Sequence, residues 1–531
     1  MELLLALVSS INGGGGIMMP VILLILFFYA LLWFISRRLL LSSEHRKKPQ
    51  PPEASGALLV IGHLHLLGGS EPAHKILGAM ADAHGPIFTL KLGVHKAVVV
   101  SSWEIAKECL TTNDRIFASR PKLTAAKLLG YNNSMFGFSE YGPFWRHMRK
   151  ITMLGLLTNN HKKQLELIVE SEIRSSIGKL YDLWVNHKKS KGEALLLVEM
   201  KSWFEDITLN TMFRMVVGKR FSTDLEGSGN QDYRKVFREF VNLFGDFVPS
   251  DSFPFLSCFD LGGYEKSMKK TAKVLDEVLD KWIKEKKNSG DHEQDFMDFL
   301  LSAVKDDEEL SGYDGDSIVK ANCLSLILAG SDTTATTMIW ALSLLLNNEE
   351  TLKKAQLELE EQVGRRRQVK VADINDLIYL EAIVKETLRL YPAAPLSVPH
   401  ESTEDCNILG YYIPARTRLI VNLQKLQRDP LVWEDPNKFQ PERFLTDQKD
   451  LDVKGQNPQL IPFGSGRRTC PGISFALQIM PLVLANFIHG FEIVRPSKEL
   501  LDMEESVGLI SVRKDPLEVV LTPRLSAQDY K

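Results

Sequence analysis

The sequence predicts a mainly helical protein with a small β region, preceded by one N-terminal transmembrane helix. Three observations support this fold class. A long uncharged run opens the chain, apolar residues then recur at helical spacing in several long segments, and short β-branched runs are confined to two regions. The composition agrees, because 44% hydrophobic and 25% charged residues are ordinary values for a globular chain, here of 531 residues.

The uncharged run covers residues 3–36, and within it residues 17–35 approach the ~20 residues that a membrane helix needs. Arg37 and Arg38 follow at once, so the positive-inside tendency predicts that the rest of the chain stays cytosolic. A cleaved signal peptide is the alternative, but its apolar core has only ~7–15 residues with positive charge ahead of it. Three prolines between residues 49 and 52 then predict a stiff hinge. We therefore expect an anchor over residues 1–48, a hinge over 49–56 and one large domain over 57–531.

Within this domain, residue periodicity and turn residues predict the elements in chain order. They are a β-hairpin over 87–102 that turns at Gly93, helices over 162–184 and 264–287, an exposed acidic loop over 306–315, a buried helix over 317–347, a helix over 373–390 that stops before Pro392, short strands at 408, 411–413 and 419–421, and a helix over 473–488.

Charge and cysteine content exclude several protein classes. Lys plus Arg number 64 and Asp plus Glu 67, so the net charge of −3 gives no support for nucleic-acid binding. The five cysteines are odd in number, far apart and without a CxxC pair, which indicates neither a disulfide framework nor a structural zinc site. They are Cys109, Cys258, Cys323, Cys406 and Cys470.

The stretch over residues 463–472 carries the strongest chemical signal. A cysteine is a useful ligand only as the thiolate, and a helix N-terminus or a neighbouring cation lowers its pKa. Cys470 has both, because a predicted helix follows it and Arg468 lies two residues away. A buried structural cysteine after a glycine turn is the alternative for this residue alone. A phosphate-binding loop would need a Lys-Ser/Thr ending, which this stretch lacks.

The fixed positions of this stretch are Phe463, Gly466, Arg468, Cys470 and Gly472. Their pattern resembles the haem-binding loop of the cytochrome P450 family. The resemblance implies the P450 fold, haem b as the cofactor, Cys470 as the axial ligand of the haem iron, and the other four positions as parts of the cofactor-binding loop. Thiolate ligation pushes electron density onto iron and favours O–O cleavage.

Two further segments are similar to haem-contacting parts of the family. Trp145 and Arg149 lie on one helix face, and the resemblance assigns both to a haem propionate, which suits the forked donors of arginine. His400 occupies the position where many plant members place an Arg or His near the other propionate. Taken alone, the first pair would be an amphipathic helix face and the histidine an ordinary polar group.

A Glu-x-x-Arg motif puts Glu386 and Arg389 on one face of a helix, where they can pair. By itself the motif would be an ordinary surface ion pair. In the family it is a buried pair that an arginine from a later Pro-Glu-Arg-Phe segment completes, and here that arginine is Arg443. The resemblance gives these three residues a structural role behind the haem.

The buried helix over 317–347 is interrupted by Ser-Asp-Thr-Thr at 331–334, and competing side-chain hydrogen bonds there predict a kink or π-bulge. An internal cap is the alternative interpretation. The segment resembles the oxygen-activation helix of the family. The resemblance implies that Thr333 hydrogen-bonds the oxygen under activation and that Asp332 relays protons from solvent, so both are candidate catalytic residues.

These motifs span the whole chain and are similar to plant microsomal P450s of specialised metabolism, the subgroup with alkaloid, terpenoid and flavonoid hydroxylases. The resemblance implies a membrane-bound monooxygenase of the endoplasmic reticulum, single-pass with a cytosolic catalytic domain. It would oxidise a lipophilic metabolite with O2 and electrons from NADPH. Since no Rossmann or flavin fingerprint occurs, the electrons would come through NADPH–cytochrome P450 reductase. The pocket-lining segments implied are residues 120–138, 322–333, 394–399 and 506–510. One departure from the subgroup is Gln424, which stands where Trp is usual.

Two other functions stay open at this point. A haem-thiolate isomerase or dehydratase has the same fold, but such enzymes usually lack the Asp-Thr pair and have an altered cysteine loop. A non-enzymatic haem sensor or membrane scaffold would need neither an oxygen-activating threonine nor a reductase.

Overall fold

The computed structural model describes residues 48–157, 159–192, 195–221, 233–289, 295–305, 310 and 313–530. The chain forms two compact units. The smaller one contains residues 48–51 and Asn407–Ile413 among those described, and the larger one contains Pro52–Cys406 and the chain from Pro414 onward. The predicted membrane span at 17–35 lies outside the described residues, as do the predicted anchor up to residue 47 and most of the predicted loop over 306–315.

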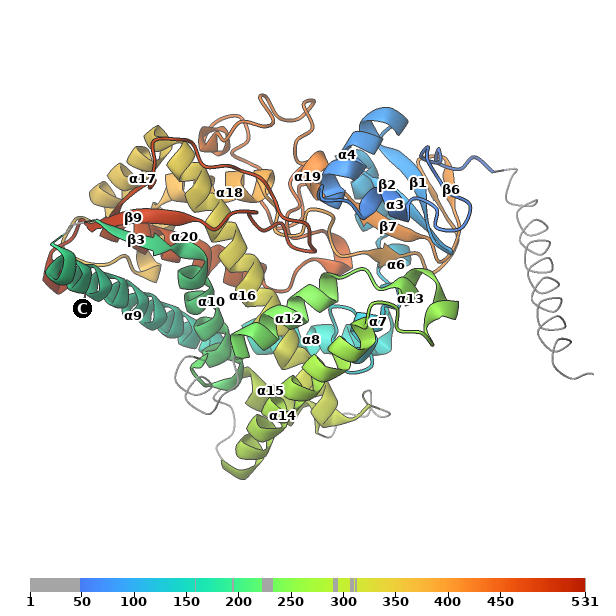
Figure 1. The fold of residues 1–531 in the computed structure, drawn as a ribbon, viewed down its shortest axis with the longest axis horizontal. Coiled ribbons are helices and arrows are strands. Elements are labelled where there is room, and N and C mark those ends of the chain that lie inside the picture. The colour runs from blue at the N-terminus through green and yellow to red at the C-terminus, as the bar shows by residue number, and fades with distance from the viewer. Residues whose placement is uncertain are drawn as a thin grey trace, which may run out of the picture. The chain divides into compact units, whose positions relative to one another are not determined.

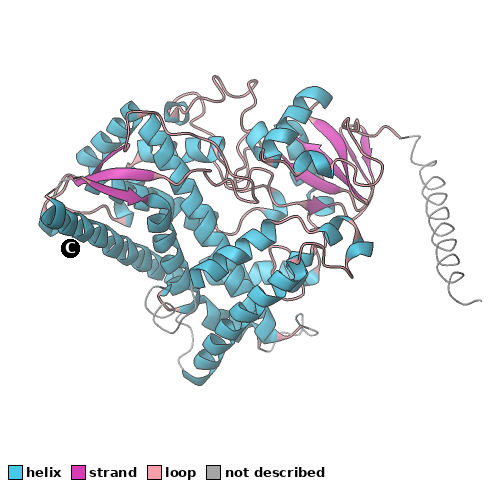
Figure 2. Ribbon diagram, in the orientation of Figure 1, coloured by secondary structure: helices cyan, strands magenta, loops and turns pink. Residues whose placement is uncertain are grey.

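Helices dominate the larger unit, as predicted (Figures 1 and 2). The long helices are α4 (Ala73–His84), α8 (Pro143–Leu157), α9 (Asn159–Lys191), α10 (Met200–Val217), α12 (Tyr233–Gly245), α14 (Tyr264–Ser289), α15 (Phe296–Val304), α16 (Gly315–Asn347), α17 (Glu349–Gln362), α18 (Ile378–Leu390) and α20 (Ile473–Gly490). The short ones are α3 (Leu64–Leu67), α5 (Trp103–Lys107), α6 (Asp114–Phe117), α7 (Thr124–Leu128), α13 (Pro249–Ser252) and α19 (Leu423–Leu426). A π-helical turn spans Glu108–Thr112, and 3-10 turns span Pro254–Leu256, Val371–Asp376, Pro441–Phe444, Gly466–Arg468 and Ala527–Tyr530.

Within the described residues, the strands form three small sheets. The strands are β1 (Ile87–Leu92), β2 (His95–Val100), β3 (Leu196–Glu199), β4 (His400–Glu401), β5 (Cys406–Ile408), β6 (Tyr411–Ile413), β7 (Arg418–Val421), β8 (Phe491–Val494) and β9 (Glu518–Pro523). The first sheet has the order β1-β2-β7-β4, in which only the β2–β7 pair is parallel. The second has the order β3-β9-β8, and β5 pairs with β6. The predicted hairpin is confirmed as β1 and β2, and Gly93 begins the turn with a φ of 63°.

Helix α16 is buried over most of its length and packs closely against α10. The close approach requires glycine at position 330, because a Cβ there would lie 2.7 Å from Met212. The predicted π-bulge is wrong, since the helical pattern runs unbroken through residues 331–334. The hydroxyls of Ser331 and Thr333 donate to the carbonyls of the preceding turn, at 2.7 and 2.6 Å, and leave the backbone hydrogen bonds in place.

Helix α18 ends before Pro392 as predicted but begins five residues later than residue 373. Its first turn is capped by Glu358, whose carboxylate accepts from the backbone N–H of Tyr379 at 2.6 Å and of Leu380 at 3.0 Å. The 3-10 turn Val371–Asp376 precedes it. Helix α20 is long and apolar enough to cross a membrane, but 72% of it is buried within the body. It is therefore a core helix.

Candidate functional site

The cysteine loop leads directly into α20. The backbone N–H of Cys470 donates to the carbonyl of Phe463 at 3.0 Å, which closes the loop. The backbone N–H of Gly472 points at the Cys470 sulfur at 3.3 Å, and the helix begins at the next residue. Burial raises the pKa of the Cys470 thiol, whereas this N–H and the charge of Arg149 lower it. The residue as a whole is half-buried, whereas Cys109 is buried.

Gly466 lets the cysteine loop approach the segment that follows α5. Its φ is 69°, and a Cβ at this position would lie 2.2 Å from the carbonyl oxygen of Leu110. The next residue, Arg467, binds the Asp114 carboxylate through its backbone N–H at 3.1 Å and its guanidinium at 2.7 Å. These contacts fix the loop on its outer side.

Arg468 points inward and donates only to main-chain carbonyls. Its guanidinium contacts the carbonyl oxygens of Ala118 at 2.6 Å, Phe136 at 3.0 Å and Ser139 at 2.6 Å. It also lies over the ring of Trp145, 4.4 Å from the ring centre. The structure therefore brings together Arg468 of the loop and Trp145 of α8, two of the residues that the sequence assigned to the cofactor.

Arg468, Arg149 and Arg120 form a group of arginines without a carboxylate partner, in which Arg120 is buried and the other two are half-buried. Burial and, to a smaller extent, the charges of Arg120 and Arg149 together lower the pKa of Arg468 to about 8. Burial also lowers the pKa of Arg120, to about 9, and the pKa of Arg149. Among the described residues, no carboxylate oxygen lies within 4.0 Å of any of the three guanidinium groups.

His400 lies near this arginine group. Burial lowers the pKa of His400, and the charges of Arg120 and Arg468 lower it as well. Its Nδ1 lies 2.7 Å from the carbonyl of Phe117.

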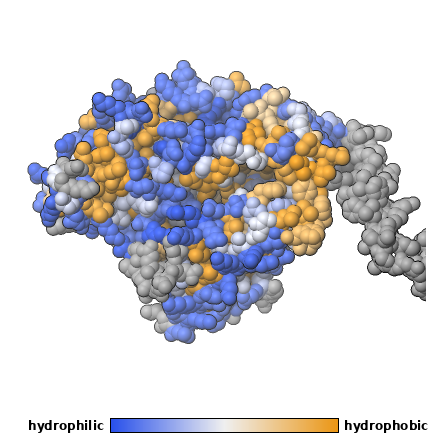
Figure 3. Space-filling model, in the orientation of Figure 1, coloured by the Kyte–Doolittle hydropathy of each residue, from blue (hydrophilic) through white to orange (hydrophobic). Residues whose placement is uncertain are grey.

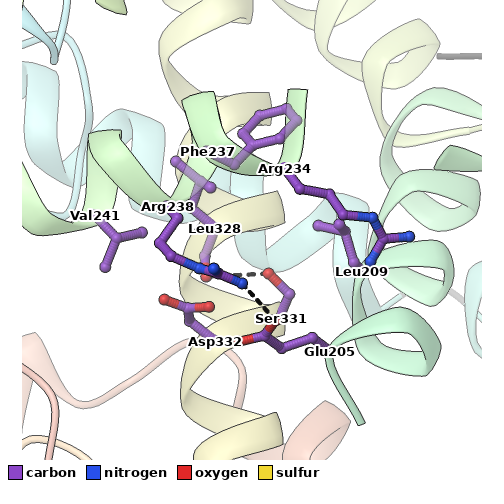
Figure 4. A pocket seen from close by; sticks show the side chains of 9 residues that line it. All are labelled: Glu205, Leu209, Arg234, Phe237, Arg238, Val241, Leu328, Ser331 and Asp332. Atoms are coloured by element: carbon purple, nitrogen blue, oxygen red, sulfur yellow. Dashed lines mark hydrogen bonds and ion pairs between the residues drawn. The ribbon is translucent and has the colours of Figure 1, made fainter. Parts of the chain in front are cut away.

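Asp332 and Thr333 face different surroundings. The Thr333 hydroxyl donates a hydrogen bond to the carbonyl of Ala329. Ala329 is exposed, although most of α16 is buried. Asp332 instead lines a cavity with Glu205 and Arg238, and Thr333 does not line it (Figure 4). Figure 4 shows the side chains of Asp332, Arg238 and Glu205 gathered at one end of this cavity, where Arg238 and Glu205 pair at 3.2 Å.

Burial is the main reason that the pKa of Asp332 is raised to about 6. The charge of Glu205 also raises it, whereas Lys201 and Arg238 lower it. The carboxyl can therefore both hold and release a proton near neutral pH.

Glu386, Arg389 and Arg443 form one buried cluster. Arg389 holds the Glu386 carboxylate with two hydrogen bonds of 2.7 Å, and both side chains are 0% exposed. Arg443 adds a third at 3.1 Å. The backbone N–H of Gln440 donates to the same carboxylate at 3.0 Å, and the Arg389 guanidinium lies 4.9 Å from the centre of the Trp433 ring. The cluster ties α18 to the 3-10 turn that contains Arg443.

Comparison with known proteins identifies the family. Residues 49–521 match the family model described as cytochrome P450. The chain belongs to the cytochrome P450 family. It is therefore a P450 monooxygenase with haem as its cofactor, and the predicted fold, mainly helical with a small β region, is the P450 fold.

Plant P450s are similar over nearly the whole chain. Flavonoid-6-hydroxylase of Ocimum basilicum is 50% identical over 90% of this chain and 92% of its own length. Demethylepipodophyllotoxin synthase of Sinopodophyllum hexandrum is 50% identical over 90% and 93%. Strychnine-10-hydroxylase of Strychnos nux-vomica is 49% identical over 90% and 92%. Among solved structures, a zebra fish cytochrome P450 with progesterone aligns with a TM-score of 0.71 and 26% identity, over 85% of this chain and 100% of that one.

The residues of the site fit a haem. The sulfur of a half-buried cysteine at a helix N-terminus can supply the iron ligand, and three buried or half-buried guanidinium groups without a carboxylate can receive the propionates. Charges that are removed from water without a counter-ion are costly, so the arginine cluster is most simply explained by a bound dianion. The donor set thus agrees with the cofactor of the family.

Sequence reasoning missed residues that only the tertiary structure brings to these sites. Arg120 was named only as the edge of a pocket-lining segment, although a single cation in the otherwise uncharged run 116–121 could have drawn attention to it. Glu205 and Arg238 come from helices far from Asp332 in the chain, and no local pattern indicates them.

Proposed function

We propose that this P450 hydroxylates a lipophilic specialised metabolite of a plant, using O2 and electrons that reach it from NADPH through a separate P450 reductase. The observation that carries the proposal is the Cys470 sulfur at the start of α20, with the Gly472 N–H directed at it. When bound there, haem supplies the activation of dioxygen.

The chain's own residues hold the cofactor and control protons. Cys470 would ligate the iron, with Phe463, Gly466 and Gly472 shaping its loop. Arg468, Arg149 and Trp145 would bind one haem propionate, and His400 would lie near the other.

Thr333 would present its hydroxyl to the reacting oxygen, and Asp332 would deliver protons from the cavity that it shares with Glu205 and Arg238. The cluster of Glu386, Arg389 and Arg443 would hold the wall behind the haem.

The substrate class rests on the relatives. Two of them are named as hydroxylases, one of flavonoids and one of strychnine. From these relatives we infer a flavonoid or an alkaloid as the substrate of this chain, and the resemblance to the plant subgroup adds a terpenoid as the third class.

A membrane position is also part of the proposal, with residues 1–48 as the anchor, 49–56 as the hinge and 57–531 as the catalytic domain at the endoplasmic reticulum. Support comes from apolar side chains on the surface, which gather at the right of Figure 3, where Figure 1 places α13. They include Phe247, Phe255, Phe259 and Leu261, each about half or more exposed, and Leu58, Leu59 and Val60. The two groups are neighbours, because Gly93 donates to the carbonyl of Ile61 and Val94 to that of Ser252. Such a patch is typical of a membrane contact.

The test uses microsomes that contain the full chain and a plant P450 reductase, supplied with NADPH, ¹⁸O2 and a panel of flavones, alkaloids and diterpenes. We expect substrate-dependent NADPH consumption and one labelled oxygen atom in the product, with neither in Cys470→Ala. Product without labelled oxygen would identify an isomerase or dehydratase instead. Bound haem with no product from any substrate would identify a non-enzymatic haem protein.

A further inference from the structure

Glu505 is a buried carboxylate that the proposed haem chemistry does not use. It lies in the chain between β8 and β9, and its side chain is 2% exposed. Its oxygens contact His74 Nε2 at 3.1 Å, Lys75 Nζ at 3.1 Å and Gln424 Nε2 at 3.1 and 3.3 Å, and accept a hydrogen bond from the Ser511 hydroxyl. Three separate parts of the chain, α4, α19 and the segment after Glu505, thus meet at one carboxylate.

This carboxylate is a fixed anion at neutral pH. Burial alone raises its pKa, but the hydrogen bonds and charges of His74, Ser511 and Lys75 outweigh burial and lower the pKa to about 2. A buried charge with all its positions occupied by donors holds its partners in one arrangement.

Gln424 connects Glu505 to a second segment. Its side-chain amide binds the carboxylate, while its backbone N–H donates to the carbonyl of Pro395 at 3.3 Å, beside the 2.8 Å bond from Leu423 to the same oxygen. Ser511 makes a similar pair of contacts, because its hydroxyl binds Glu505 and its backbone N–H donates to Ala393 at 2.9 Å. The segments over 393–395 and 505–511 are therefore joined twice.

The same network reaches the helix that carries Thr333. The indole N–H of Trp340 donates to the carbonyl of Ser511 at 2.6 Å. Trp340 lies seven residues after Thr333 in α16, which is two turns along the same face. At the other end of the loop, Leu509 lies against Gly245 of α12, where a Cβ would be 3.0 Å away.

We propose that Gln424 is a positioning residue that, through Glu505 and Pro395, holds the two pocket walls over 394–399 and 506–510 at a fixed spacing and so sets which atom of a substrate is oxidised. The inference rests on the proposed function and on the resemblance to the family, which assigns both segments to the pocket.

The test replaces Gln424 with methionine in the full-length holoenzyme. Methionine keeps the length of the side chain but donates no hydrogen bond, and Glu505 retains its other donors. Ser511→Ala removes the hydroxyl bond that ties residue 511 to Glu505, while the backbone bond from residue 511 to Ala393 stays in place. Gln362→Met on the exposed end of α17 is the control. The probes are 1-phenylimidazole and 4-phenylimidazole, which bind haem iron through nitrogen and direct their phenyl rings differently.

We expect the ratio of the two dissociation constants to change by at least about threefold in Gln424→Met and Ser511→Ala and to stay unchanged in Gln362→Met. Haem content and the reduced carbon-monoxide spectrum should match the wild type in all three. An unchanged ratio in Gln424→Met and Ser511→Ala, with the thiolate spectrum intact, would overturn this inference alone. A wild-type protein without the thiolate spectrum would overturn the proposed function as well.

Discussion

Asp332 stands out among individual residues because its carboxyl titrates near the pH of the cell. Burial raises its pKa to about 6, and the charge of Glu205 contributes to the increase. As pH rises above 6 the protonated fraction of Asp332 falls, so proton delivery should become slower. We expect turnover of the wild type to decline above pH 6 and Asp332→Asn to be slow at every pH, without this decline. Turnover measured against pH, with saturating reductase, tests this.

Glu205→Gln gives an independent test of the same environment. Removing the negative charge lowers the pKa of Asp332, so the decline should begin at a lower pH than in the wild type. Lys201→Gln removes a positive charge that lowers this pKa and should shift the decline to higher pH. A profile that neither substitution moves would show that Asp332 does not control the rate.

Thr333 offers a second prediction at the residue scale. Its hydroxyl donates to the Ala329 carbonyl on the accessible part of α16. Thr333→Ala should keep haem bound but release a larger share of the consumed NADPH electrons as hydrogen peroxide. Ser302→Ala in α15 removes a similar back-bonded hydroxyl from another helix and serves as the control. Equal peroxide yields in the two variants would remove Thr333 from the mechanism.

Among the elements, α18 carries one buried and one surface ion pair, which allows a matched comparison. Glu386→Gln leaves Arg389 and Arg443 buried without their carboxylate, and we expect a loss of about 3–5 kcal/mol in the free energy of unfolding. Glu381→Gln breaks the surface pair with Lys385 and should cost at most about 1 kcal/mol. Urea unfolding of both variants measures the difference. Similar losses would contradict a supporting role for the buried cluster.

The elements also show which parts of a fold are visible in sequence. The hairpin β1–β2 and the body of α16 follow from local patterns, because alternation and apolar runs report directly on burial. The sheet β3-β9-β8 was not predicted, since Leu196 pairs with Leu521 across most of the chain. The start of α18 was misplaced because a distant carboxylate, Glu358, caps it. Pairing and capping by distant segments leave no local signal.

At the scale of the whole molecule, the sequence predicts those parts of the site that are local motifs. It does not predict the parts formed by residues that become neighbours only in the tertiary structure. The loop around Cys470 and the motif of Glu386 are read from short patterns. The cationic surroundings of Arg468 depend on Arg120, and the surroundings of Asp332 depend on Glu205 and Arg238. These neighbours come from elements that meet only in the folded chain.

The network around Glu505 predicts how global stability depends on pH. The carboxylate's pKa is lowered from 4.5 to about 2 in the folded protein. Its contribution is therefore fully present above pH 4.5 and is lost as pH falls toward about 2. The size is on the order of 3 kcal/mol, at about 1.4 kcal/mol per pKa unit. Acid unfolding should show this loss in the wild type and in Glu504→Gln on the exposed neighbour, but not in Glu505→Gln. Equal acid sensitivity of all three would contradict it.

The central claim is that Cys470 is the thiolate ligand of the haem. The most direct measurement is the carbon-monoxide difference spectrum of the reduced protein, compared between the wild type, Cys470→Ala and Cys406→Ala, with total haem measured in each. We expect the red-shifted band of thiolate-ligated haem in the wild type and in Cys406→Ala, and its complete loss in Cys470→Ala. If Cys470→Ala binds haem and keeps that band, another residue ligates the iron and the assignment of the site is wrong.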